Sequence, residues 1–164
     1  MARDRVERTI DELRATRDEL DTQPAEAVLR VLLLGRTLEQ RIGDTLEPFG
    51  LQVWEFDVLA ALRRQGAPYC LPCGDLARQV VITCSGMTHR VSRLAERGLV
   101  VRTRDDSDRR TVFVALTDDG RELVDQAIER RLGDSAELLG ALDSDERAAL
   151  IALLRRMNEA AGGD

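Results

Sequence analysis

The sequence contains no lysine and few aromatic residues. All 24 basic side chains are arginines, and aromatic residues make up 3% of the 164 residues. We interpret the absence of lysine as a bias of genomic composition. Leucine, valine and alanine dominate the apolar residues, which favours helices in a chain long enough for one domain.

Long apolar runs are also missing. No run approaches the roughly 18 residues of a membrane span, and the arginine- and aspartate-rich start lacks the apolar region of a signal peptide. We therefore expect a cytoplasmic protein that does not bind membranes. The chain has three cysteines, an odd number, and no export signal, so we expect no structural disulfides.

Histidine occurs once, so a metal site or a catalytic base has to involve His89. A zinc set with the spacing C-x2-C-x10-C-x4-H would consist of Cys70, Cys73, Cys84 and His89. We disfavour it because Cys84 begins the helix predicted for residues 83–97, and His89 would have to turn away from the outer face of that helix. The sequence predicts no metal and no cofactor.

The formal net charge of −6 argues against indiscriminate affinity for nucleic acids. The charge is unevenly distributed, however. Residues 83–110 contain seven arginines and four acidic residues, a balance of +3, and the remainder therefore carries −9. A basic segment in an acidic chain indicates a local surface for an anionic partner such as double-stranded DNA.

The segment 83–97 is predicted to be a helix that enters the major groove of DNA. Met87, Val91 and Leu94 are spaced by four and three residues, so they share one face that packs inward. A shorter amphipathic helix at 75–80 and a turn near residues 81 and 82 complete a helix-turn-helix. The outer face carries hydrogen-bonding side chains and a glycine that allows close backbone approach, namely Ser85, Gly86, Thr88, His89 and Arg93.

A β-hairpin is predicted directly after this helix. Gly98 stands where a left-handed C-terminal cap ends a helix. The stretches Leu99–Arg104 and Thr111–Leu116 are rich in β-branched and apolar residues, as strands are, and the polar loop Asp105–Arg110 joins them. A helix-turn-helix followed by a basic-tipped hairpin is a winged helix.

In the run from Asp75 to Leu123 the sequence resembles the MarR family of small dimeric bacterial repressors. The matching motifs are Arg93-Leu94, Gly98-Leu99-Val100, Asp108-Arg109-Arg110 and Leu116-Thr117-Asp118-Asp119-Gly120. With the flanking helices, the resemblance covers about the whole chain beyond residue 24. It implies a mainly α fold with a small β-hairpin wing, in which a winged helix-turn-helix domain is attached to a helical dimerisation domain.

The resemblance also assigns roles within the wing. The family's minor-groove arginine aligns with Arg110, which Asp108 would brace by a charge-assisted hydrogen bond, and Arg109 would contact phosphate. Ser85, Thr88, His89 and Arg93 would read the major groove. The chain is thus expected to be a DNA-binding transcriptional regulator, a repressor rather than an enzyme.

Three regions are expected along the chain. Residues 1–22 form an extra N-terminal helix, 24–50 and 117–160 a helical dimerisation region, and 51–116 the winged helix-turn-helix. The run VLRVLLLG at 28–35 is apolar nearly all round, which a surface helix cannot sustain, so we expect a second subunit to bury it. A homodimer would bind a pseudo-palindromic operator, with its recognition helices about one DNA turn apart.

A small organic anion is the expected effector. The urate-responsive subgroup of the family resembles this chain in its extra N-terminal helix and at Asp57, Arg90 and Arg102, which there hold or respond to the ligand. That subgroup also has a tryptophan on its first helix, where Ile10–Leu20 has none. The effector can therefore be another small organic anion, whose carboxylates Arg90 and Arg102 would bind bidentately.

Asp57 has Val53, Trp54, Ala60 and Ala61 as helical neighbours, and Arg90 has Met87, Val91 and Leu94, so we expect the two charged side chains to be buried close together. A structural role for them as a core ion pair is equally open.

A thiol switch is the alternative regulation. Cys70 and Cys73 form a C-x-x-C in the segment 65–74, which is predicted to be a loop, and their oxidation or metal binding could shift the helix-turn-helix that follows. Oxidant-responsive members of the family usually carry their sensing cysteine near the N-terminus instead. A thiol oxidoreductase is a distant alternative, because helix and loop rather than a strand are predicted before the motif.

Overall fold

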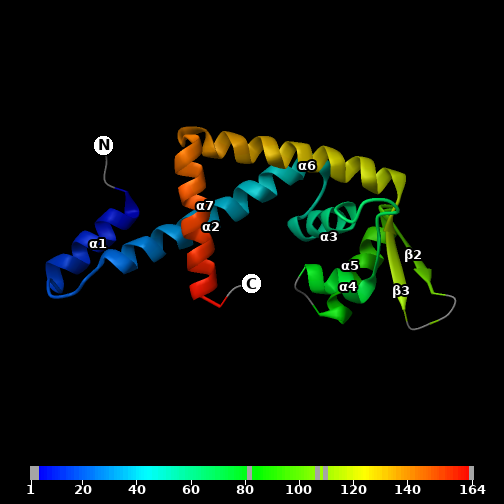
Figure 1. Cartoon of the computed structure of the whole chain (residues 1–164), viewed down its shortest axis with the longest axis horizontal. Coiled ribbons are helices and arrows are strands. Elements are labelled where there is room, and N and C mark those ends of the chain that lie inside the picture. Colours follow the sequence, from blue (N-terminus) through cyan, green and yellow to red (C-terminus); the bar gives the residue numbers. More distant parts are fainter. Residues whose placement is uncertain (1–3, 81–82, 106–107, 109–110, 163–164) are drawn as a thin grey trace. The chain divides into compact units, whose positions relative to one another are not determined.

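The computed structural model describes residues 4–80, 83–105, 108 and 111–162, without the side chain of Cys84. By its internal contacts the chain divides into two compact units, 1–44 and 45–164. Within the described ranges no helix has the length and apolar character needed to cross a membrane. Figure 1 shows the order of the helices and strands.

The first unit pairs helix α1 (Arg5–Thr16) with most of α2 (Gln23–Leu46). Asp4 caps α1, because its carboxylate accepts a hydrogen bond from the Glu7 amide at 2.8 Å. Arg30 of α2 pairs with the same carboxylate at 2.7 Å. Val6 and Ile10 of α1 are buried, with 5% and 1% of their surface exposed.

Helix α2 leaves an apolar face uncovered. Val28, Val31, Leu32 and Leu34 are all exposed in the single chain, Leu32 to 56%. These residues belong to the run that the sequence analysis expects a second subunit to bury. The chain itself does not bury it.

The second unit contains the end of α2, seven further helical segments and three strands in its described part. In chain order they are η1 (Glu47–Phe49), α3 (Val53–Arg63), β1 (Cys70–Pro72), α4 (Cys73–Gln79), α5 (Cys84–Glu96), β2 (Val100–Arg104), β3 (Val112–Leu116), α6 (Asp118–Leu138), η2 (Leu139–Ala141) and α7 (Ser144–Ala160). The predicted helix-turn-helix is the pair α4 and α5, and the predicted wing is the β2–β3 hairpin (Figure 1).

The three strands form one antiparallel sheet in the order β1–β3–β2. Leu71 of β1 lies opposite Val114 of β3, and Arg102 of β2 lies opposite the same valine on the other side. Strand β1 corrects the prediction that 65–74 is wholly a loop. A three-residue strand that includes Pro72 has no periodicity of its own, and it is stabilised by β3, which lies far along the chain.

The core of the second unit lies among α3, α4, α5, α6 and β3. Met87, Val91 and Leu94 of α5 are completely buried, which confirms the predicted inner face of this helix. They share the core with other fully buried side chains, including Leu46, Val58, Leu59, Leu62, Leu76, Val114 and Val124. This packing fixes which side of α5 faces outward.

The end of α5 and the start of α6 lie in direct contact, with the wing between them in the chain. Gly98 ends α5 with φ of +72°, as its predicted cap role requires. Thr117 caps α6 by accepting from the Gly120 amide at 2.9 Å and donates to the Gly98 carbonyl at 2.8 Å. A Cβ at Gly120 would lie 2.0 Å from the carbonyl oxygen of Leu99, so only glycine fits there.

Helices α6 and α7 also expose apolar side chains. Leu132 on α6 is 66% exposed, and Ile151 and Leu153 on α7 are 57% and 55% exposed. Asp143 caps α7 with hydrogen bonds of 2.9 Å from the amides of Asp145 and Glu146. These uncovered faces belong to the region expected to form the dimer.

Candidate nucleic-acid interface and an adjoining cavity

The outer face of α5 has the composition that the sequence analysis predicts for a DNA-reading surface. Thr83 caps the helix, its hydroxyl accepting a hydrogen bond from the Gly86 amide at 3.2 Å. Ser85, His89 and Arg93 follow on the exposed side. The arrangement presents hydroxyl, imidazole and guanidinium groups to a partner, and their role in binding DNA stays a prediction.

Two arginines of α5 lie against one aromatic ring. The guanidinium carbon of Arg90 is 5.3 Å from the ring centroid of Trp54 on α3, and that of Arg93 is 5.1 Å from the same centroid. The indole N–H of Trp54 donates to the side-chain oxygen of Gln52. Since both distances fall within the range of cation–π attraction, Trp54 restrains both arginines.

A third arginine of this region, Arg97, has a structural role. Nη1 of Arg97 lies 2.8 Å from Oε2 of Glu55, whose side chain is only 3% exposed. The same carboxylate oxygen accepts a hydrogen bond from the Gln52 amide at 2.9 Å. The end of α5 is thereby tied to the start of α3.

Arg102 connects the wing to α5. Its Nη1 donates to the hydroxyl of Ser92 at 3.0 Å, and that hydroxyl donates to the Thr88 carbonyl at 3.0 Å. The tip of the wing lies partly outside the described residues, including Arg109 and Arg110. Asp108 is described, and its carboxylate accepts from the Thr111 hydroxyl at 3.0 Å.

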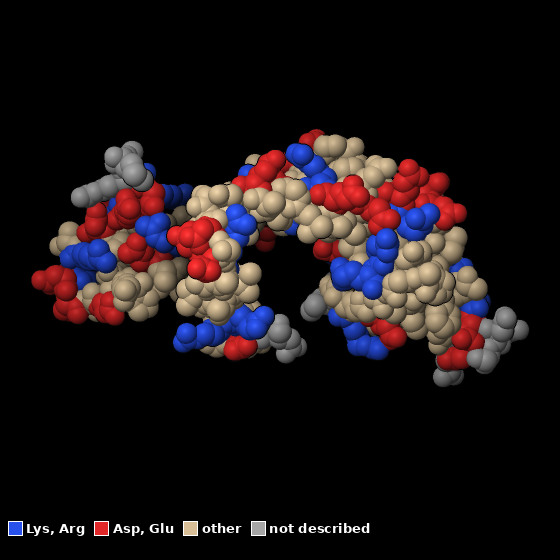
Figure 2. Space-filling model, turned by 45° about the horizontal axis from the view of Figure 1, so that its top comes forward, with Lys and Arg blue, Asp and Glu red and all other residues tan. Residues whose placement is uncertain are grey.

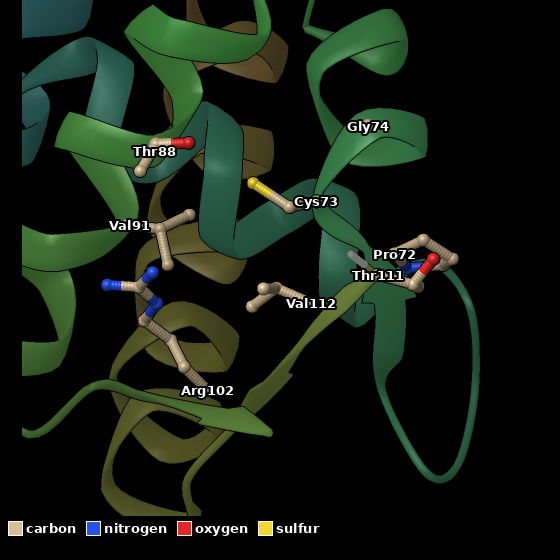
Figure 3. Close-up of a pocket in the computed structure, with 8 residues that line it drawn as sticks. All are labelled: Pro72, Cys73, Gly74, Thr88, Val91, Arg102, Thr111 and Val112. Carbon is tan, nitrogen blue, oxygen red and sulfur yellow. The ribbon is translucent and has the colours of Figure 1, made fainter. Parts of the chain in front are cut away.

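A cavity of about 340 Å³ lies between the helix-turn-helix and the wing, and we call it the Arg102 cavity. Figure 3 shows the Cys73 sulfur pointing from α4 toward α5, and the Arg102 side chain extending from β2 toward the same helix. The lining consists of Pro72, Cys73, Gly74, Thr88, Val91, Arg102, Thr111 and Val112. One guanidinium among hydroxyl and apolar groups suits a small anion with an apolar body.

The predicted burial of Asp57 beside Arg90 is wrong. Asp57 is exposed, and within the described part of the chain it forms no ion pair with Arg90. Although the side chain is exposed, the protein around it partly desolvates the carboxylate and raises the pKa of Asp57, while the positive charges of Arg64, Arg90 and Arg131 oppose that rise.

None of the cavities lined by described residues holds all three candidate ligand residues. Asp57 lines a separate hollow of about 200 Å³ with Arg64, Gln79 and Val80. Arg102 lines the larger cavity, and Arg90 lies against Trp54.

The cysteine motif spans a strand and a helix start. Cys70 lies on β1, and Cys73 is the first residue of α4, with both thiols half-buried and not joined in a disulfide. Burial raises the pKa of the Cys70 thiol, which lowers its thiolate fraction. Among the side chains that are described, no three histidine, cysteine or acidic groups form a metal-binding cluster.

Charge is unevenly distributed on part of the second unit. In the right-hand part of Figure 2, acidic side chains are frequent along the upper edge, and basic side chains form patches on the left-hand and lower sides, with some acidic side chains among them. Asp118 and Asp119 in the first turn of α6 contribute to the acidic content of this unit.

Trp54 and the Glu55–Arg97 pair are the features that the sequence analysis missed. Trp54 and Glu55 both lie on α3; the sequence places Trp54 among apolar neighbours and assigns no role to Glu55. The sequence does offer one indication for Trp54: it is the sole tryptophan of a chain that also has a predicted arginine-rich helix, and tryptophan is the side chain best suited to cation–π contacts with arginine. For the ion pair the sequence offers no local signal, because 42 positions separate Glu55 from Arg97.

A family model described as the MarR family matches residues 49–111. The HTH-type transcriptional regulator PecS of Dickeya dadantii is 29% identical over 150 residues, which cover 92% of this chain and 90% of PecS. The matched segment of the family model contains α4, α5 and β2, so it coincides with the candidate interface.

Two solved structures have the same fold. AbsC, a MarR family transcriptional regulator from Streptomyces coelicolor, superposes with a TM-score of 0.76 at 25% identity, covering 88% of this chain and 97% of AbsC. BpsR of Bordetella bronchiseptica superposes with a TM-score of 0.63 at 32% identity, covering 79% of this chain and 98% of BpsR. That structure is described as explaining how 6-hydroxynicotinic acid regulates the DNA binding of BpsR.

Proposed function

The chain belongs to the MarR family of winged-helix transcriptional regulators, and on this premise we propose that it is a homodimeric repressor which a small organic anion releases from a pseudo-palindromic operator. Its relatives are regulators of transcription and not enzymes. Strand β1 stands before Cys73, so the predicted lack of a strand no longer argues against a thiol oxidoreductase. The relatives still do, because they regulate transcription.

The proposed DNA contacts lie on α5 and the wing. Ser85, His89 and Arg93 are exposed on α5, so they are free to reach base edges and phosphates in a major groove. Gly86 allows the backbone to approach, and Thr88 is exposed as well as lining the Arg102 cavity. At the wing, Arg110 is proposed to enter the minor groove with Asp108 bracing it, and Arg109 is proposed to contact phosphate.

The proposed dimer would cover the apolar faces of α2, α6 and α7. Exposed leucines, isoleucines and valines recur on all three helices, and burial of such a surface is the main stabilising contribution to most permanent interfaces. Two copies related by a two-fold axis would present two α5 helices, which matches a pseudo-palindromic site.

The Arg102 cavity is the proposed anion site, and it is the observation that carries the proposal. An anion bound there would compete with Ser92 for the Arg102 guanidinium, and so weaken the link between the wing and α5. Release from DNA requires that the anion bind the DNA-incompetent state more tightly than the DNA-bound state. The regulation of BpsR by 6-hydroxynicotinic acid, an aromatic carboxylic acid, supports a ligand of this class.

The proposal is tested by selecting a duplex with the purified protein from a random-sequence library. Fluorescence anisotropy then measures affinity for that duplex with and without 6-hydroxynicotinate, benzoate or urate. We expect a duplex with two related half-sites and a loss of affinity with at least one anion. Selection of no sequence would contradict the repressor, and unchanged affinity with a broad set of organic anions would contradict the effector class.

A thiol switch is the second candidate, because Cys73 lines the same cavity as Arg102. The raised pKa of Cys70 argues against rapid oxidation of that thiol. Mass spectrometry of the protein purified without chelator, before and after peroxide, distinguishes the candidates. A Cys70–Cys73 disulfide or bound zinc, together with loss of DNA binding, would favour the switch over the anion.

A further inference from the structure

The arginines between residues 90 and 102 differ in what holds them. Arg97 is paired with the buried carboxylate of Glu55, and Arg102 is hydrogen-bonded to Ser92 at the cavity. Among the residues whose placement is described, Arg90 and Arg93 form no ion pair, and each contacts Trp54. The aromatic ring therefore distinguishes these two arginines from the others.

An aromatic partner has a different electrostatic consequence from a carboxylate. A carboxylate neutralises a guanidinium, as Glu55 does for Arg97, whereas an indole ring attracts the cation through its quadrupole and carries no net charge. Arg90 and Arg93 thus keep their full positive charge while the ring limits their motion. Restraint before binding reduces the conformational entropy that is lost when a side chain meets a phosphate.

The ring itself is held in place. Trp54 is the second residue of α3, its indole N–H donates to Gln52, and the neighbouring Glu55 ties the same end of α3 to Arg97. Arg90 and Arg93 are three residues apart on α5, so they lie one above the other on one side of that helix. The start of α3 therefore acts as a fixed support beside two cations of the recognition helix.

We propose that Trp54 is a positioning residue of the DNA-binding surface, whose ring holds Arg90 and Arg93 as a pair of cations for the phosphate backbone. The inference rests on the proposed DNA binding and adds to it a residue from outside the helix-turn-helix. It also gives Arg90 a role at the DNA rather than at the anion site. In this proposal Trp54 does not contact DNA itself and acts only by positioning the two arginines.

The test compares Trp54→Leu with Trp54→Phe in anisotropy titrations against the selected duplex, with thermal unfolding to show that both variants fold. Trp54→Leu should lower affinity about tenfold, because two cation–π contacts are lost, and should reduce the slope of log affinity against log salt by about one. Trp54→Phe keeps a ring and should recover most of the affinity.

The decisive comparison repeats Trp54→Leu in a variant that carries Arg90→Ala and Arg93→Ala. If Trp54 acts through the arginines, the substitution should have almost no effect in that background. An equal loss in both backgrounds would overturn the inference and make Trp54 a folding residue.

Trp54 is the sole tryptophan, so its emission also reports directly on the wild-type protein. Saturating duplex should change this emission, and an unchanged spectrum would overturn the inference. Failure of the wild type to bind any selected duplex would instead contradict the proposed function.

Discussion

Oε2 of Glu55 lies 2.8 Å from Nη1 of Arg97, and this pair joins the start of α3 to the end of the recognition helix α5. Glu55 is 3% exposed, whereas Arg97 is 37% exposed, so the carboxylate depends on its partner more than the guanidinium does. The apolar neighbours of Asp57 and Arg90 predict a buried pair between the same two helices, but the structure has that pair at Glu55 and Arg97.

Replacing Glu55 by glutamine should destabilise the protein by about 2 kcal/mol. The change removes the charge that Arg97 faces and weakens the bond from the Gln52 amide, but partial exposure of Arg97 allows water to compensate. Urea unfolding followed by circular dichroism gives the value. Glu96→Gln, at an exposed position of α5, is the matched control and should change stability by less than about 0.5 kcal/mol. Equal effects of the two substitutions would contradict the role of the pair.

Gly120→Ala should be severely destabilising, by about 3 kcal/mol or more, because the new Cβ would collide with the Leu99 carbonyl oxygen at 2.0 Å. Thermal unfolding measures the effect. Gly133→Ala on the same helix is the control: nothing lies within 4 Å of its added Cβ, and alanine favours a helix interior by up to about 1 kcal/mol. A Gly120 variant as stable as the Gly133 variant would show that the start of α6 does not approach Leu99 as described.

Leu132→Glu should convert the dimer to monomers without unfolding the chain. The side chain is 66% exposed in one chain, so a charge there leaves the chain's own core intact but is buried unpaired in the proposed interface. Light scattering gives the mass, and circular dichroism the helix content. As a control, Glu122→Gln at an exposed position of α6 should leave the mass unchanged. A dimer that persists with Leu132→Glu would place the interface away from this part of α6.

Alkylation of Cys70 should show a pH midpoint above the ordinary thiol value. Burial raises the pKa of this thiol, so the reactive thiolate appears only at higher pH in the folded protein than in the unfolded chain. Iodoacetamide rates for a variant with Cys73→Ser and Cys84→Ser, measured from pH 7 to 10 in buffer and in urea, test this. By linkage, the neutral thiol's contribution to stability is complete below the unfolded pKa and is lost as the pH rises through the folded pKa. A lower midpoint in the folded state would favour the thiol switch.

Much of the winged helix could be predicted from the sequence, because its signals are local. The spacing of Met87, Val91 and Leu94 gave the inner face of α5, and all three are completely buried. Gly98 and Thr117 end and begin helices as their residue types suggest. These positions are decided by neighbours within a few residues, which is the range that periodicity and capping rules cover.

The errors concern contacts between distant segments. Strand β1 exists because Cys70 lies opposite Ala115, and no property of its three residues predicts that pairing. Asp57 was placed in the core because apolar residues surround it on α3, yet Val53 among them is 39% exposed. Small and apolar neighbours on a short helix do not determine which side of it is covered.

The account's central claim, that an anion in the Arg102 cavity releases the operator, is tested most directly by one anisotropy measurement. The affinity of the selected duplex is compared with and without saturating anion for wild type, Arg102→Gln and Arg104→Gln, where Arg104 lies on the same strand but does not line the cavity. We predict that the anion weakens binding about tenfold or more for wild type and Arg104→Gln, and by less than about twofold for Arg102→Gln. An Arg102→Gln variant that responds to the anion as the wild type does would contradict the claim.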